Sequence, residues 1–135
     1  MFRDAFPIVY VADLTASLTF YRDLLGFTET YRFPPGDAAE FVGLTLAQGG
    51  AGLALATATD GQTGSHGRPM RLGGGHQFEL CIYTDDLDRA VADLRDRAVE
   101  VLVEPVDQPW GERMAYVADP EGHPIMICQT LGGAD

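Results

Sequence analysis

The side chains able to carry out chemistry are few and lie far apart in the sequence. There are three histidines, His66, His76 and His123, and two cysteines, Cys81 and Cys128. The cysteines lie inside apolar segments and form no CxxC pair or other metal-ligand spacing, so we expect both to be reduced and buried. No Ser–His–Asp or Cys–His arrangement marks an activated nucleophile, which gives covalent catalysis little support.

His76 lies three residues before Glu79, near the start of an expected strand. An odd offset along a strand turns two side chains to opposite faces, so we do not expect this pair to share a metal site. His66 and His123 fall in an expected loop and an expected turn, where most histidines are solvated. Of these two, His66 is the better candidate for contact with a ligand.

Trp110 is the only tryptophan of the chain. Its broad aromatic face suits stacking on a planar heteroaromatic or quinone ring. A structural role, as a plug in the core at a strand edge, is the alternative. Tyr31, Phe33 and Phe41 add aromatic rings around a loop. Phe33 stands beside two prolines and is hard to bury, whereas core packing is the alternative for Phe41.

The elements that position these residues follow a pattern that occurs twice. An apolar strand at 7–11 leads into a helix at 14–25, with Asp13 as N-cap and Gly26 as C-terminal stop. Leu14, Leu18, Tyr21 and Leu25 recur there at helical spacing. Strands are expected at 28–33, 40–47 and 52–58, with a hairpin turn at 48–51.

The second half repeats this order. A strand at 78–83 precedes a helix at 87–97, capped at 85–86, and strands follow at 100–103, 114–118 and 125–130, with a turn at 119–122. The segments 11–14 and 84–87 match at an offset of 73 residues. We therefore predict one domain, 1–135, with βαβββ modules at 6–58 and 78–130.

A Gly-rich linker is expected at 59–77, between the modules. It is long for a compact domain, so it is either mobile or part of a binding site. Its glycine run at 73–75 precedes no Gly-Lys-Ser/Thr sequence and no helix, and is therefore not a phosphate-binding loop.

Composition and charge restrict the partners. With 135 residues, 46% of them hydrophobic and 21% charged, the chain has the profile of one folded domain. No apolar run approaches the roughly 20 residues of a membrane span, and the start lacks a signal-peptide pattern, so we expect a cytoplasmic protein. The net charge of −11 disfavours nucleic acid and would attract a cationic ligand, unless the acidity serves solubility alone.

Two motifs resemble one family. Residues 18–27, LTFYRDLLGF, are similar to the SLxFYxxxLGF helix signature of the glyoxalase/bleomycin resistance/extradiol dioxygenase group, the vicinal oxygen chelate superfamily. Residues 119–123, DPEGH, resemble its DPxGN/H turn. The likeness spans about residues 6–129. It implies an α+β fold in which two tandem βαβββ modules form a curved mixed-sheet cup around a pocket.

The resemblance also implies where a metal would be held. Metal-dependent members carry ligands at positions that correspond here to Phe6, Glu79 and Met126. Phe cannot ligate, and thioether sulfur suits soft copper rather than Mg²⁺, Mn²⁺ or Zn²⁺. We therefore expect no divalent metal, no other cofactor and no catalytic residue.

Residues 108–113, QPWGER, resemble a segment of the drug-binding branch of the superfamily, which includes bleomycin- and mitomycin-binding resistance proteins. Such proteins hold an antibiotic without altering it. We predict a homodimer that sequesters a hydrophobic or aromatic antitumour antibiotic, bleomycin-, mitomycin- or enediyne-like, in clefts at the subunit interface. The expected ligand-binding residues are Phe6, Tyr31, Phe33, Phe41, His66, Met70, Glu79, Trp110, Arg113 and Met126.

Two other functions stay open. One is an enzyme of the same superfamily, a lyase, isomerase or dioxygenase, with an unusual or absent metal. The other is a regulatory or interaction protein of this fold that binds no small ligand.

Overall fold

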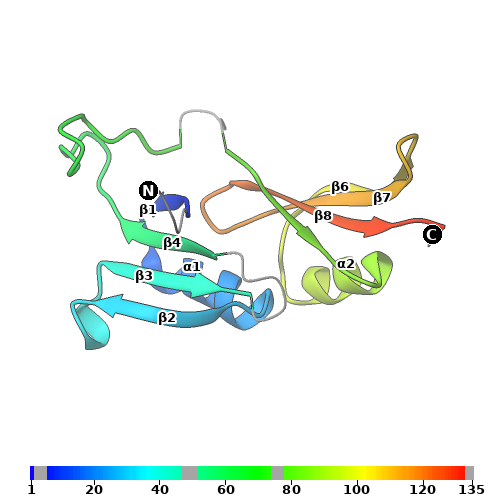
Figure 1. Cartoon of the computed structure of the whole chain (residues 1–135), viewed down its shortest axis with the longest axis horizontal. Coiled ribbons are helices and arrows are strands. Elements are labelled where there is room, and N and C mark those ends of the chain that lie inside the picture. The colour runs from blue at the N-terminus through cyan, green and yellow to red at the C-terminus, as the bar shows by residue number, and fades with distance from the viewer. Residues whose placement is uncertain (2–5, 47–51, 74–77, 133–135) are drawn as a thin grey trace. The chain divides into compact units, whose positions relative to one another are not determined.

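The computed structural model describes residues 1, 6–46, 52–73 and 78–132. The chain forms two compact units, Met1–Gly74 and Gly75–Asp135, and each is described by itself (Figure 1). Both units contain one four-stranded mixed sheet, in the strand orders β1-β4-β3-β2 and β5-β8-β7-β6.

The first unit follows the predicted order. It consists of β1 (Ile8–Val11), α1 (Leu14–Leu18), a π-helical stretch η1 (Thr19–Leu24), β2 (Thr28–Phe33), a 3₁₀ turn η2 (Gly36–Ala38), β3 (Phe41–Thr45) and β4 (Gly52–Thr57). β1 runs parallel to β4, and the other two pairings are antiparallel.

The second unit repeats this topology. It consists of β5 (Leu80–Tyr83), α2 (Leu87–Asp96), β6 (Val101–Gln108), β7 (Glu112–Ala118) and β8 (Pro124–Thr130). β5 runs parallel to β8, and the remaining pairings are antiparallel. The prediction of an α+β fold built from two βαβββ modules is confirmed.

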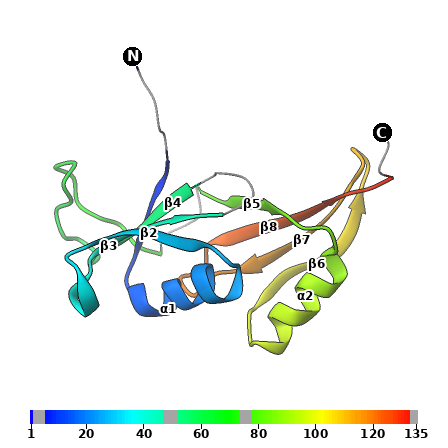
Figure 2. The ribbon, with the colours of Figure 1, turned by 60° about the horizontal axis from the view of Figure 1, so that its bottom comes forward.

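One face of each sheet is buried under the helix of its own unit (Figure 2). Strand residues alternate between faces, so every second side chain enters the core. In the first unit, Val42, Leu44 and Leu55 are buried together with Leu18 and Tyr21 of the helix. The corresponding core residues of the second unit are Val91, Leu94, Ala115, Val117, Ile125 and Ile127.

Both predicted N-caps are confirmed. The backbone N–H of Ala16 donates to the carboxylate of Asp13 over 2.9 Å, and that of Arg89 donates to Asp86 over 3.2 Å. Each carboxylate thereby satisfies an N–H that has no partner within its own helix.

The expectation of one regular helix at 14–25 is wrong after Leu18. The chain widens there into a π-helical stretch, in which the N–H of Leu25 donates to the carbonyl of Phe20 over 3.0 Å. The wider turn places both Phe20 and Tyr21 in the core and leaves Leu25 only partly buried. Helical periodicity alone does not reveal such a change of register.

The expected strand at 100–103 is too short, because β6 continues to Gln108 and contains Pro105. Proline cannot donate to a strand ladder but is tolerated on an edge strand, and β6 is an edge strand with shifts of register between Val101 and Val106. Cys81 is exposed, contrary to expectation, whereas Cys128 is buried. The other bounds differ from prediction by up to two residues.

The described part of the linker, 59–73, forms a hydrogen-bonded hairpin. The N–H of Gly61 donates to the carbonyl of Met70 over 2.8 Å, and the N–H of Met70 donates to the carbonyl of Gln62 over 2.7 Å. The N–H of Leu72 donates to the carboxylate of Asp60 over 2.7 Å. His76 and the turn at 48–51 lie outside the described residues.

Asp119 organises the turn between β7 and β8. Its buried carboxylate accepts the N–H groups of Glu121 and His123 over 2.9 and 2.8 Å, and its other oxygen lies 2.7 Å from His123 Nδ1. This hydrogen bond raises the pKa of His123 against the opposing effect of burial. In the described part of the chain, no helix is long and apolar enough to cross a membrane.

Replacing Ser17 with Ala should stabilise the protein. The Ser17 hydroxyl is fully buried in α1 and has no hydrogen-bond partner among the described residues. An unsatisfied buried hydroxyl costs about 1 to 3 kcal/mol, so Ser17→Ala should raise the free energy of unfolding in urea by about 1 kcal/mol. Thr15→Ala, at an exposed position of the same helix, measures the change in helix propensity alone. A gain no larger than that control would contradict the prediction.

The Asp119–His123 pair should make stability depend on pH. Because the pKa of folded His123 is raised, protonated His123 stabilises the folded state below its ordinary pKa. This contribution is lost as the pH rises through the folded pKa, from about pH 6.5 upward. The stability advantage of the parent over His123→Gln, measured by urea unfolding at several pH values, should therefore shrink as the pH rises. An advantage that is constant or grows would refute the pairing.

Candidate functional site

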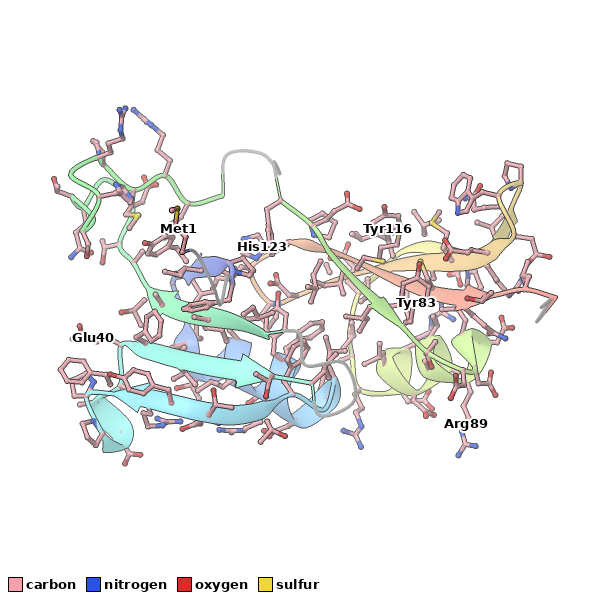
Figure 3. All side chains as sticks on the ribbon, in the orientation of Figure 1. Met1, Glu40, Tyr83, Arg89, Tyr116 and His123 are labelled. Carbon is pink, nitrogen blue, oxygen red and sulfur yellow. The ribbon has the colours of Figure 1, made fainter. Side chains whose placement is uncertain are left out.

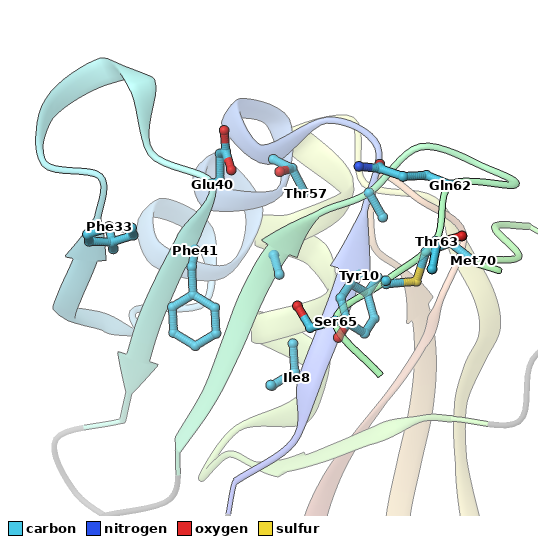
Figure 4. A pocket seen from close by; sticks show the side chains of 13 residues that line it. Ile8, Tyr10, Phe33, Glu40, Phe41, Thr57, Gln62, Thr63, Ser65 and Met70 are labelled. Atoms are coloured by element: carbon cyan, nitrogen blue, oxygen red, sulfur yellow. The ribbon is translucent and has the colours of Figure 1, made fainter. Parts of the chain in front are cut away.

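A pocket of about 370 Å³ opens on the face of the first sheet that α1 does not cover (Figure 4). Phe33 and Phe41 lie on one side of it, and Tyr10 and Met70 lie on the other. β1, β3 and β4, the end of β2 and the hairpin 59–73 all contribute. The lining residues are Ile8, Tyr10, Phe33, Glu40, Phe41, Ala56, Thr57, Ala58, Gln62, Thr63, Gly64, Ser65 and Met70.

Small side chains on β4 help to hollow this face. The register places Ala54 beside Ile8 and Gly43, and places Ala56 beside Tyr10 and Phe41. In the second unit, the strand that corresponds to β4 carries Met126, Cys128 and Thr130 on the equivalent face, by alternation along β8. The first unit therefore has room for a ligand where the second carries sulfur-containing side chains.

The outer wall of the pocket is aromatic. Phe33 and Phe41 are cross-strand partners, and the Tyr31 ring packs edge-on against Phe41 with centroids 6.0 Å apart. On the opposite wall, the rings of Tyr10 and His66 meet edge-on at 6.3 Å. Phe33 remains 59% exposed, so its ring is available for contact with a ligand.

The hairpin 59–73 forms the remaining wall. Within it, the backbone of Gly64 packs closely against the side chains of Met70 and His66. A Cβ at residue 64 would lie 2.5 Å from Met70 Cε and 2.9 Å from His66 Nε2. Any side chain there would displace Met70, which is only 8% exposed. The absence of a side chain at Gly64 thus keeps Met70 against the pocket.

Among the described residues that line the pocket, Glu40 is the only acidic or basic side chain. The other polar groups of the lining are the hydroxyls of Tyr10, Thr57, Thr63 and Ser65 and the amide of Gln62. The described lining residues include no arginine or histidine, although the His66 ring packs against Tyr10 at one wall. This lining favours a neutral or cationic ligand over an anion.

The three positions that the resemblance assigns to a metal carry different side chains. Phe6 is half-exposed and lies two residues before β1 of the first unit. In the second unit, the Tyr116 hydroxyl donates to the Glu79 carboxylate over 2.7 Å, which raises the pKa of Tyr116 to about 12. Met126 pairs with Tyr116 across β7 and β8. The described residues contain no cluster of three or more His, Cys, Asp or Glu arranged for a metal.

Trp110 lies at the tip of the β6–β7 hairpin and is 63% exposed, so its interpretation as a core plug is wrong. Its indole N–H donates to Glu112 over 3.0 Å, and the Tyr83 hydroxyl donates to the same carboxylate over 2.6 Å. Glu112 thereby raises the pKa of Tyr83 to about 12. Tyr83 and Tyr116 both belong to the second sheet (Figure 3).

Arg113 is held by two carboxylates. Its guanidinium lies 3.0 Å from Asp88 on α2 and 2.8 Å from Asp107 on β6. These ion pairs raise the pKa of Arg113. They connect the helix to two strands of the sheet, which is a structural role.

Five residues of the predicted site come together within the first unit. Phe33, Phe41 and Met70 line one pocket, and Tyr31 and His66 pack against its walls. The residues predicted from the second half lie in the second unit, at three separate places.

Sequence reasoning missed Tyr10 and Glu40, which also line the pocket. Tyr10 stands between the buried Val9 and Val11, and strict alternation places it on the open face. That pattern could have identified it.

The profile of the Glyoxalase/Bleomycin resistance protein/Dioxygenase superfamily matches residues 5–127. The chain therefore belongs to this superfamily, whose fold it shares. No curated protein shows a significant match.

Solved structures cover nearly the whole chain. A superfamily member from Sphaerobacter thermophilus DSM 20745 is 24% identical, with a TM-score of 0.74 over 95% of this chain and 98% of that one. TnmS3, an antibiotic-binding protein from Streptomyces sp. CB03234, is 26% identical, with a TM-score of 0.68 over 96% and 98%. A lactoylglutathione lyase from Agrobacterium tumefaciens is 22% identical, with a TM-score of 0.67 over 93% and 92%.

Removing the Trp110 side chain should leave the fold intact. Because the ring is exposed, Trp110→Ala should change the free energy of unfolding by no more than about 0.5 kcal/mol. Tyr21→Ala, at a fully buried aromatic position, should cost about 3 to 5 kcal/mol and serves as the comparison. Urea unfolding measures both. A loss of several kcal/mol in Trp110→Ala would show that the ring is a core residue.

Proposed function

We propose that this protein binds a hydrophobic or aromatic antibiotic in the pocket of the first unit and holds it in the cytoplasm without chemical conversion. The observation that carries the proposal is the lining of that pocket. Phe33, Phe41 and Tyr10 present aromatic surface around the pocket, whose one acidic side chain among the described lining residues is Glu40. Apolar walls with a few placed polar groups are typical of small-molecule binding sites.

Sequestration requires that the ligand be bound but not that it react. The side chains of the pocket fit this requirement. Among the described lining residues, the ionisable side chains are Glu40 and Tyr10, and none is a histidine, cysteine or lysine that could act as a base or nucleophile. A cationic group on the ligand would be favoured by Glu40 and by the net charge of −11.

The size of the pocket suits part of a large antibiotic. A volume of about 370 Å³ lies near the lower end of the range for drug-sized ligands, about 300 to 1,000 Å³. It fits a planar ring system better than an entire glycopeptide. The relative TnmS3 is an antibiotic-binding protein, which supports an antibiotic as the ligand. The class that we propose is bleomycin-, mitomycin- or enediyne-like.

We further propose a homodimer in which the ligand clefts lie at the subunit interface. Large apolar side chains remain exposed on the first unit, among them Phe6, Ile8, Tyr31 and Phe33. Association of two chains would remove such a surface from water.

A lyase-like or dioxygenase-like enzyme of the same superfamily is the alternative function. Glu79 favours it, because a carboxylate occupies one of the positions that hold a metal in the related enzymes and is oriented by Tyr116. Turnover of the ligand would distinguish this enzyme from a sequestering protein.

Calorimetric titration with mitomycin, bleomycin and an aromatic enediyne tests the proposal. At least one should bind, and Phe41→Ala and Ala56→Leu, which remove an aromatic wall and fill the hollow, should each weaken binding about tenfold or more. Leu102→Ala, at an exposed apolar position of β6, is the matched control and should bind like the parent.

The bound compound should be recovered unchanged by mass spectrometry. Absence of binding by all three compounds, or full affinity in both pocket variants, would refute the proposed site. A chemically altered compound would instead identify the enzyme.

A further inference from the structure

Two cysteines that are 47 residues apart in sequence meet on the second sheet. Cys81 of β5 and Cys128 of β8 have Sγ atoms 3.8 Å apart. Cys81 is exposed, whereas Cys128 is only 1% exposed. The pair thus combines one residue that is open to solvent with one that is buried.

Two methionines flank this thiol pair. The parallel register of β5 and β8 sets Cys81 opposite Met126, and the antiparallel register of β7 and β8 sets Cys128 opposite Met114. Side chains at paired positions share a face of the sheet. Ile125 and Ile127 alternate with these residues on β8 and are buried on the face toward α2, so the four sulfur-bearing side chains occupy the other face.

We propose that Cys81 and Cys128, together with the thioethers of Met126 and Met114, form a binding site for a soft, thiophilic cation such as Cu(I). Thiolate and thioether sulfur select soft cations over Mg²⁺ or Mn²⁺. On binding, each thiol releases its proton to solvent and its sulfur donates an electron pair to the cation. Neither the sulfur nor the metal changes oxidation state.

The distance between the thiols fits this ligand better than a disulfide. One thiol donates a hydrogen bond to the other over 3.8 Å. Two thiolates about 2.3 Å from a tetrahedral ion would lie about the same distance apart, so a cation could replace this hydrogen bond with little movement of the sulfur atoms. A disulfide requires about 2.05 Å between the sulfur atoms, so oxidation would have to pull the two side chains together.

The neighbouring carboxylates do not complete a site for a hard ion. Glu79 accepts the hydroxyl of Tyr116, and Glu112 accepts the hydroxyl of Tyr83 and the indole N–H of Trp110. The site consists of described residues of the second unit alone. It is therefore independent of the pocket in the first unit and of the function proposed for that pocket.

The test is an anaerobic titration of the full, reduced chain with Cu(I) in competition with a chromophoric Cu(I) chelator. The parent should take up one Cu(I) per chain. Cys81→Ser should lower the affinity at least tenfold, and Met126→Leu should lower it several-fold. Met70→Leu replaces a methionine of the first unit and should leave Cu(I) affinity unchanged.

Cys128→Ala retains the exposed thiol of Cys81. It therefore distinguishes a site that needs both thiols from binding of Cu(I) by Cys81 alone. The affinity should fall at least tenfold while circular dichroism reports an intact fold. Should this variant unfold, Cys81→Ser and Met126→Leu still decide the question.

Three results would overturn the proposal. These are failure of the parent to take Cu(I) from the chelator, unchanged affinity in both Cys81→Ser and Met126→Leu, and a Cys81–Cys128 disulfide in protein purified without oxidant. Displacement of Cu(I) by an equal concentration of Zn²⁺ would refute its preference for soft cations.

Discussion

The packing of each helix against one face of its own sheet decides which side chains remain available for binding. Alternation along a strand sends every second residue into the core, so the remaining residues must occupy the opposite face. In the first unit, Val9 and Val11 are buried and Tyr10 between them lines the pocket. In the second unit, Ile125 and Ile127 are buried, and Met126 and Cys128 occupy the other face. The functional surface therefore follows from the same packing that stabilises each unit.

The duplicated topology carries two different surfaces. The first unit places the small side chain of Ala56 on β4 between Tyr10 and Phe41, in the lining of the pocket. The second unit places thioether, thiol and Tyr–Glu pairs on the equivalent strands. Because the backbone pattern is the same, the difference in binding chemistry lies in the side chains of the open faces. Different side chains on the open faces of two repeats are expected when binding depends on individual sites and not on the fold that the repeats share.

Local patterns predicted the fold well, whereas contacts between distant residues could not be predicted. Asp13 and Asp86 identified both helix starts, since a cap involves residues three positions apart. The predicted strand at 100–103 ended too early because β6 continues through Pro105. Proline is tolerated in a strand only at the edge of a sheet, and the sequence does not show that β6 is an edge strand. The meeting of Cys81 and Cys128 depends on the register of two parallel strands, which no local spacing encodes. Among the predicted ligand-binding residues, those near the first sheet converge on one pocket because β2 and β3 pair there.

We propose that an aromatic antibiotic binds on the open face of the first sheet. The most direct measurement is the change in backbone amide chemical shifts when an aromatic antibiotic is added to the isotope-labelled protein. We expect the largest changes in β1, β3, β4 and the hairpin 59–73, which form the pocket. Changes concentrated around Trp110 in the β6–β7 hairpin, with none along the first sheet, would contradict it.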